Sequence, residues 1–209
     1  MSNNINYQKE LDKLIEYNEK NNIIPSLLIH SCCAPCSSYT LDYLSKYFNI
    51  TVVYYNPNIF PKEEYEYRIK EQKRLIEEMD FVNPVKFIST EYSPNDFYEK
   101  IKGHEKDLEG GERCAICFKI RLEYTAKLAK SMGFDYFVTT LSISPLKNSK
   151  ILNEIGQEIA EKHGVKYLIS DFKKKDGYKK SVELSKTYNL YRQDYCGCVY
   201  SKLERENKL

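Results

Sequence analysis

The sequence of 209 residues lacks several features that mark common functional classes. No stretch is long and apolar enough to cross a bilayer, and the first residues contain no apolar segment of the signal-peptide type. Lysine and arginine exceed aspartate and glutamate by only 2 charges, so the basic surplus typical of many nucleic-acid-binding proteins is missing. These absences predict a cytoplasmic protein whose thiols are kept reduced.

Cysteine, by contrast, occurs seven times and in three tight groups. The groups lie roughly eighty residues apart, so only the fold can bring their sulfurs together. Structural disulfides are rare in a reducing compartment, and this many thiols therefore indicate metal or redox chemistry. The seven residues are Cys32, Cys33, Cys36, Cys114, Cys117, Cys196 and Cys198.

Hydrophobic periodicity predicts an alternation of strands and helices along the chain. Such an alternation predicts a three-layer α/β fold, in which a five-stranded parallel sheet carries helices on both faces. We expect one catalytic domain over 1–209, made of an N-terminal helix in 1–22, a Rossmann-like core in 23–172 and a helical C-terminal segment in 173–209. The strands are expected at 27–30, 50–55, 85–88, 136–140 and 166–169, and the main helices at 5–20, 38–48, 62–79, 114–132, 149–163 and 178–189.

Residues that follow the strands are the first candidates for a site, because ligands bind beyond the carboxyl ends of the strands in such sheets. The first cysteine group directly follows the first predicted strand, and Asp171 follows the fifth. Asp171 could supply an oxygen ligand or hold a proton, although a capping or surface role explains it equally well. His30 abuts the cysteine loop, but core packing accounts for it as well as metal ligation does.

The spacing within each cysteine group indicates what its sulfurs can do. Cys114 and Cys117 lie three residues apart on a predicted helix, so they share a face and can bind one metal or two corners of a cluster. The helix N-terminus and Arg113 favour their thiolate forms. A disulfide between Cys196 and Cys198 would close a small, strained ring, which suits a reversible two-electron store or a pair of metal ligands.

Three interpretations of these thiols remain open from spacing alone. The first is a tetrahedral structural zinc site. The cysteine spacings differ, however, from those of zinc ribbons and zinc fingers, and a zinc ion needs only four of the seven sulfurs. Thioredoxin-like thiol–disulfide exchange would use one pair of cysteines and leave the other five without a function. An iron–sulfur cluster on four thiolates is favoured, with the remaining sulfurs serving another metal or a redox pair.

The chain also resembles a known family across about residues 26–202. The segments that carry the resemblance are, in order, LLIHSCCAPCSSYTLDYL, YNPNIFPKEEYEYR, RCAICFKIRLEYTAKLA, FVTTLSISPLKN, SDFKKKDGYKKS and YRQDYCGCVYS. Together they resemble the cobalamin-independent epoxyqueuosine reductases of queuosine tRNA modification (QueH type). The resemblance implies an iron–sulfur oxidoreductase that reduces the epoxide of epoxyqueuosine in tRNA to queuosine, the last step of queuosine biosynthesis. It also implies a relative of the adenine-nucleotide α-hydrolase (HUP) fold, but SCCAPCSS replaces the glycine-rich SGGxDS loop, which argues against ATP use.

The resemblance further implies roles for individual residues. A [4Fe–4S] cluster would be held by Cys32, Cys33, Cys114 and Cys117, and Cys196 and Cys198 would form the redox-active pair, able to close a disulfide bond. Cys36 would then bind an additional mononuclear iron or zinc ion, with Asp171 and a C-terminal cysteine. Lys173 stands where the family tends to have arginine, which removes a bidentate contact.

The implied partners are a tRNA with a GUN anticodon carrying epoxyqueuosine at the wobble position and an unidentified electron donor, with the protein itself a monomer. Cys196 and Cys198 are the expected catalytic thiols, and Asp171 or Tyr195 would protonate the departing oxygen. Two other functions compete with this one. An iron–sulfur-dependent tRNA thiolation enzyme of the same fold would consume ATP, and a zinc-stabilised RNA-binding module would contain zinc without sulfide.

Overall fold

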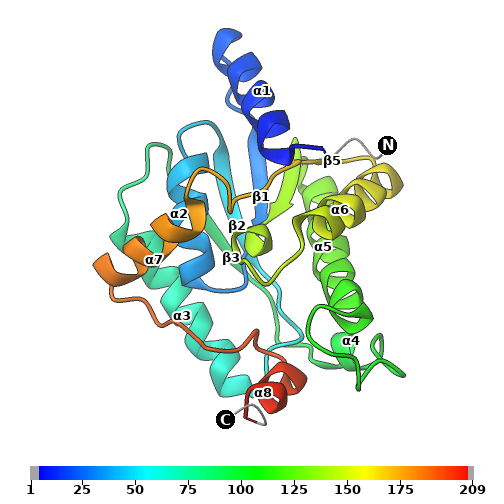
Figure 1. Ribbon diagram of the computed structural model, residues 1–209. Coiled ribbons are helices and arrows are strands. Elements are labelled where there is room, and N and C mark those ends of the chain that lie inside the picture. The colour runs from blue at the N-terminus through cyan, green and yellow to red at the C-terminus, as the bar shows by residue number, and fades with distance from the viewer. Residues whose placement is uncertain (1–4, 207–209) are drawn as a thin grey trace.

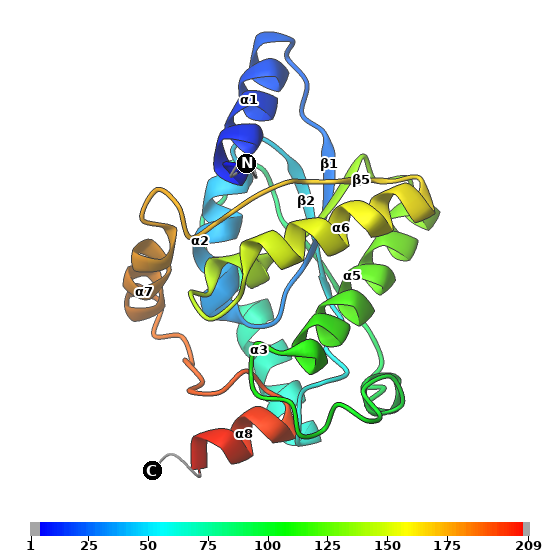
Figure 2. The ribbon, with the colours of Figure 1, turned by 45° about the vertical axis from the view of Figure 1, so that its right-hand side comes forward.

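The computed structural model describes residues 5–206 and contains one five-stranded sheet whose strands all run parallel (Figure 1). The strand order is β3-β2-β1-β4-β5. The strands are β1 (Ser26–His30), β2 (Asn49–Tyr54), β3 (Lys86–Ser89), β4 (Tyr136–Thr139) and β5 (Lys166–Tyr167). The predicted three-layer α/β fold is therefore confirmed, because helices also cover both faces of this sheet (Figures 1 and 2).

One face is covered by α5 and α6, which pack against each other and against β1, β4 and β5. The opposite face is covered by α2, with α3 and α7 packed against it. The longer helices are α1 (Tyr7–Lys20), α2 (Ala34–Leu44), α3 (Lys62–Glu78), α5 (Glu112–Met132), α6 (Ser149–His163), α7 (Gly177–Thr187) and α8 (Val199–Glu206). Two short elements, α4 (Asn95–Tyr98) and the 3-10 turn η1 (Thr140–Ile143), complete the described chain.

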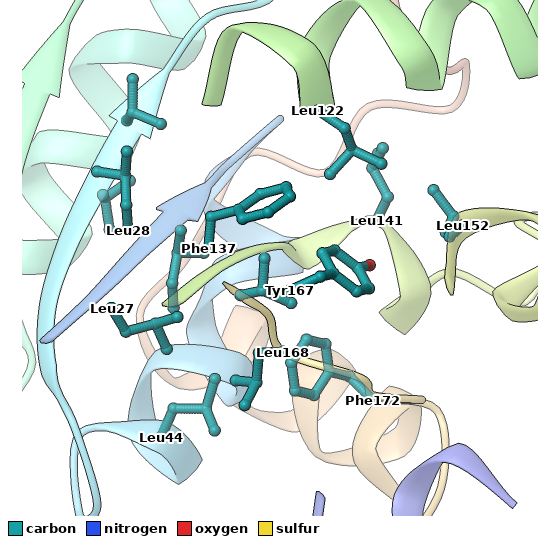
Figure 3. Close-up of a cluster of buried hydrophobic side chains, with 14 of the residues drawn as sticks. Leu27, Leu28, Leu44, Leu122, Phe137, Leu141, Leu152, Tyr167, Leu168 and Phe172 are labelled. Carbon is teal, nitrogen blue, oxygen red and sulfur yellow. The ribbon is translucent and has the colours of Figure 1, made fainter. Parts of the chain in front are cut away.

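The core lies on both sides of the central strands. Leu27 and Leu28 of β1 are fully buried and, as neighbours in a strand, point to opposite faces of the sheet. On β4, the ring of Phe137 meets the ring of Tyr167 edge-on at 5.2 Å, and Leu122 of α5 lies close to them (Figure 3). Truncating such a buried leucine to alanine typically costs about 2–5 kcal/mol, so this aliphatic core is the main support of the fold.

The boundaries of some elements differ from the prediction. The first helix of the core, α2, begins at Ala34 rather than at residue 38, because Pro35 occupies the first turn, where its missing N–H leaves no hydrogen bond unmade. Cys33 is consequently the N-cap of α2, and Cys36 lies in its first turn. The last strand, β5, is only two residues long, and α4 and η1 are too short to show periodicity.

The order of the strands creates a switch point between β1 and β4. From β1 the chain proceeds to β2 on one side, whereas from β4 it proceeds to β5 on the other side. Beyond the carboxyl ends of these two strands lie the first cysteine group and η1, which is the usual place for a ligand in open α/β sheets. None of the helices in residues 5–206 is both long and apolar enough to span a membrane.

Candidate metal and redox site

The first three cysteines form a compact group at the N-terminus of α2. The Sγ atoms of Cys32, Cys33 and Cys36 all lie within 4.8 Å of one another, and those of Cys32 and Cys33 are 3.7 Å apart. Hydrogen bonds from Cys32 and Cys36 lower the pKa of Cys33 well below its usual range, whereas the interaction with Cys33 raises the pKa of Cys32 to about 12. The neighbouring thiols therefore favour the thiolate form of Cys33, and three sulfurs at this spacing can bind a metal ion.

The remaining four cysteines gather around a second, smaller space. Cys114 and Cys117 open α5, and Cys196 and Cys198 reach them from the segment that precedes α8. All four line a cavity of about 10 Å³, referred to below as the small cavity. Burial raises the pKa of Cys114 and raises that of Cys117 to about 12, so these thiols ionise only when a cation or metal compensates their charge.

Gly197 allows the last two cysteines to approach this space. Its φ of +122° lies in a region that favours glycine, and a Cβ at this position would lie 3.0 Å from Cγ1 of Ile59 and 3.1 Å from Nη1 of Arg68. Its carbonyl also accepts a hydrogen bond of 2.8 Å from the Phe60 N–H. The backbone conformation thus favours glycine at position 197, and the cysteines on either side of it supply the thiols.

A larger cavity of about 340 Å³ opens next to the first cysteine group, and we call it the large cavity. Its wall combines an apolar side, formed by Leu141, Ile143 and Leu146, with polar groups from the C-terminal segment. Cavities of this size are typical of small-molecule sites. The residues that carry chemistry in its wall are Cys32, Cys33, Cys36, Glu109, Arg121, Lys147, Arg192, Gln193, Asp194, Tyr195 and Cys196.

The two cavities share three wall residues, which are Glu109, Arg121 and Cys196. Arg121 is 1% exposed, and among the described residues it forms no ion pair with a carboxylate. Burial lowers its pKa, but the charges of thiols from both groups, Cys117, Cys196, Cys32 and Cys114, outweigh that effect and raise it. Within residues 5–206 its buried Nη2 atom has no hydrogen-bond partner, so the guanidinium can compensate negative charge on nearby sulfurs.

The structure brings some of the predicted site residues together and leaves others apart. The four predicted cluster ligands are divided between the cavities, with Cys32 and Cys33 in the wall of the large one and Cys114 and Cys117 in that of the small one. Asp171 lines neither cavity. Its carboxylate accepts one hydrogen bond from the Ser149 hydroxyl and pairs with Lys173 at 3.0 Å.

Other candidates are also placed by their hydrogen bonds. His30 is fully buried, with Nδ1 2.9 Å from the Thr139 hydroxyl and Nε2 3.1 Å from the Tyr55 carbonyl, and burial lowers its pKa to about 3. The neutral ring is thus a packed core residue rather than a ligand. Tyr195 lines the large cavity beside Cys196, and its hydroxyl donates to the Phe60 carbonyl. The Lys173 ammonium donates to two carbonyls in addition to pairing with Asp171, which uses all three of its donors.

Several charged residues of the site were missed by reasoning from the sequence, among them Arg121, Glu109 and Lys147. Arg121 follows Cys117 by four residues and so shares its helix face, a signal that could have been recognised. Glu109 and Lys147 have no such signal, because they lie 38 residues apart in irregular segments and meet only in the folded chain. They form an ion pair of 2.7 Å at the boundary of the two cavities.

These residues fit a metal centre with sulfur ligands. Seven free cysteines are available, and the buried cations Arg121, Lys147 and Arg68 can compensate negative charge on their sulfurs. The side chain of Arg68 is 1% exposed and, like that of Arg121, has a buried Nη2 without a hydrogen-bond partner in the described part of the chain. Thiolates stabilised in this way are the usual ligands of iron–sulfur clusters and of zinc.

Comparison with known proteins identifies the family. The model of the family described as "Epoxyqueuosine reductase QueH" matches residues 27–204, which include every cysteine. The chain belongs to the epoxyqueuosine reductase QueH family. Among QueH proteins, it is 45% identical over 199 residues to that of Streptococcus pyogenes serotype M1, covering 94% of this chain and 78% of the relative.

Two further relatives carry the same name. The chain is 43% identical to the epoxyqueuosine reductase QueH of Staphylococcus aureus, over 96% of this chain and 85% of the relative. It is 39% identical to that of Thermotoga maritima, over 88% of this chain and 93% of the relative. The similarity thus spans the sheet, both cysteine cavities and the C-terminal segment, which confirms the resemblance inferred from the sequence motifs.

Proposed function

We propose that this chain is a tRNA-modifying oxidoreductase that reduces the epoxide of epoxyqueuosine in tRNA, which yields queuosine in the last step of its biosynthesis. Membership of the QueH family is the observation that carries this proposal. The substrate is a tRNA with a GUN anticodon that holds epoxyqueuosine at the wobble position. The large cavity of about 340 Å³ can receive a single nucleoside once its base has left the anticodon stack.

The proposed metal centre uses the ligands expected from the sequence. Cys32, Cys33, Cys114 and Cys117 would hold a [4Fe–4S] cluster, which when bound could pass on single electrons from the dithiol. Cys36 is left for an additional mononuclear iron or zinc ion. Because Asp171 pairs with Lys173 outside the cavity, its proposed part in binding that ion or donating a proton would require its side chain to turn inward.

The two electrons of the reaction come from Cys196 and Cys198. Both C–O bonds of the epoxide break, an alkene forms, and the oxygen leaves as water after taking two protons. The two thiols become a disulfide and release two electrons and two protons, so the step balances. An external electron donor then reduces the disulfide, and the φ of +122° at Gly197 provides the local conformation in which both sulfurs face the small cavity.

The decisive experiment is the anaerobic determination of iron, acid-labile sulfide and zinc, followed by an assay with epoxyqueuosine-tRNA. We expect iron and sulfide in equal amounts, about four of each per chain, with any surplus metal at the Cys36 site, and conversion of the epoxide to the alkene by mass spectrometry. One zinc per chain with no sulfide would favour the RNA-binding module instead. ATP-dependent adenylation of tRNA would favour a thiolation enzyme.

The dithiol is tested by Cys196→Ser and Cys198→Ser. Each variant should lose turnover by at least about 10³-fold while keeping wild-type acid-labile sulfide, because the substitution removes the electron pair but no proposed cluster ligand. In the wild type, a single turnover without external reductant should consume two free thiols. Full activity in either variant would remove the dithiol from the mechanism.

A further inference from the structure

Lys147 is a buried cation in the wall of the large cavity. It follows η1, and its side chain is only 7% exposed. The loop that carries it is fixed by two hydrogen bonds: the Lys147 N–H donates to the Ser144 carbonyl at 3.1 Å, and the Lys147 carbonyl accepts from the Lys173 ammonium at 3.2 Å. The position of this ammonium group is therefore set by the fold and not by a flexible surface loop.

The ammonium group belongs to a side chain that lines the large cavity together with Cys196. Burial lowers the pKa of Lys147, but the charges of Cys196, Glu109 and Cys114 outweigh burial and raise that pKa well above its ordinary value. Lys147 is thus a cation that pairs with Glu109 in the same cavity wall as Cys196, one thiol of the proposed redox pair.

Lys147 also has hydrogen-bond capacity to spare. An ammonium group has three donors, and in residues 5–206 its only hydrogen-bond acceptor is Glu109, at 2.7 Å. The two remaining donors belong to a side chain that lines the large cavity. These two donors are therefore available to an oxygen atom of a substrate bound in that cavity.

We propose that Lys147 is a further catalytic residue, which donates hydrogen bonds to the epoxide oxygen and stabilises the negative charge that develops as the first C–O bond breaks. This inference rests on the proposed reductase function. As that bond breaks, its electron pair moves to the oxygen, and the resulting charge is compensated by the ammonium group. The oxygen departs as water after the second C–O bond breaks, with electrons and protons supplied by the Cys196/Cys198 dithiol as above.

Glu109 acts on the reaction through Lys147 and is a positioning residue. Its carboxylate holds the ammonium group at the boundary of the two cavities and stabilises it as a cation. Other side chains that could donate a hydrogen bond to the epoxide oxygen are less well placed. The hydroxyl of Tyr195 already donates to the Phe60 carbonyl, and Asp171 faces Ser149 and Lys173 outside both cavities.

The test compares Lys147→Met, which keeps the length of the side chain without its charge, with Lys147→Arg. Steady-state kinetics on epoxyqueuosine-tRNA, normalised to bound iron, should show kcat lower by about 10²–10³-fold for Lys147→Met with KM changed less than about threefold. For Lys147→Arg we expect kcat lower by about tenfold, because the larger planar head displaces the oxygen. Lys150→Met is the matched control, since Lys150 lies outside both cavities and its side chain is 68% exposed, and its kcat should equal that of the wild type.

Normalisation to iron separates catalysis from a merely structural ion pair. If Lys147 only supports the site, Lys147→Met will lose iron or thermal stability but retain kcat per bound iron within threefold of the wild type, and the inference is overturned. If Lys147→Met does not fold, the neutral variant Lys147→Gln replaces it in the test, and a kcat per bound iron within threefold of the wild type in that variant overturns the inference. A wild-type protein that contains the cluster but does not reduce the epoxide would instead refute the proposed function.

Discussion

At the scale of single residues, charge decides what the cysteines of this protein can do. Arg121 lines both the large and the small cavity, and its buried guanidinium interacts electrostatically with the sulfur atoms of cysteines from both. A buried cation of this kind is costly unless anions surround it, and thiolates bound to metal are such anions. The position of Arg121 therefore indicates that the thiols of both cavities carry negative charge when the site is assembled.

Replacement of Arg121 tests this idea. Arg121→Met should lose most of the bound iron and sulfide, because several thiolates would be left without the cation that compensates them in a buried site. Arg121→Lys should retain more of both, since it keeps the charge. Arg74→Met is the control, because Arg74 is a partly exposed cation that pairs with Glu71 and Glu78 of its own helix. Wild-type iron and sulfide in Arg121→Met, measured by colorimetric assay after anaerobic purification, would contradict this role.

At the scale of elements, the starts of two helices place the site. Helix α2 begins at Ala34, so Cys33 caps its N-terminus and Cys36 occupies its first turn. Helix α7 packs against α2 and contributes Tyr178 and Ser181 to the wall of the large cavity. The packing at the start of α7 is tight, because a Cβ at Gly177 would collide with the Phe172 carbonyl and lie 2.6 Å from Cε1 of Tyr39.

Gly177→Ala should consequently destabilise the protein although alanine favours helices. The added methyl group must displace backbone, which typically costs about 1–3 kcal/mol. Chemical denaturation monitored by circular dichroism measures this loss, and Lys179→Ala, an exposed position of the same helix, should change stability by less than about 0.5 kcal/mol. Equal stabilities of the two variants would show that the contact between α7 and α2 is loose.

At the scale of the whole molecule, the sheet and the metal site depend on different interactions. The strands are held by an aliphatic and aromatic core in which Leu27, Leu28 and Phe137 are fully buried. The segment that carries Cys196 and Cys198 is instead attached by a few hydrogen bonds, among them Phe60 N–H to the Gly197 carbonyl and Arg68 to the Cys196 carbonyl. This difference predicts that the two parts respond differently when metal is removed.

Removal of metal by an anaerobic chelator should leave the far-ultraviolet circular dichroism close to that of the loaded protein while lowering Tm by several degrees. A ligand that binds only the folded state stabilises it, and its loss has the opposite effect. Hydrogen exchange should increase in residues 190–198 and remain unchanged in β1 and β4. Loss of most secondary structure on chelation would instead mean that the metal is required for folding, as in zinc fingers.

Local patterns along the chain were sufficient to predict the parallel α/β sheet, the position of the first cysteine group after β1 and the family, because periodicity and short motifs are properties of neighbouring residues. The ends of helices and strands were less predictable. Helix α2 begins at Ala34, next to a proline, and β5 has only two residues, so neither gives a periodic signal. Only the tertiary structure decided which thiols share a cavity and that Glu109, Arg121 and Lys147 lie among them. These groups come from distant segments, and the contacts between them form only when the sheet and the helices that cover it are packed.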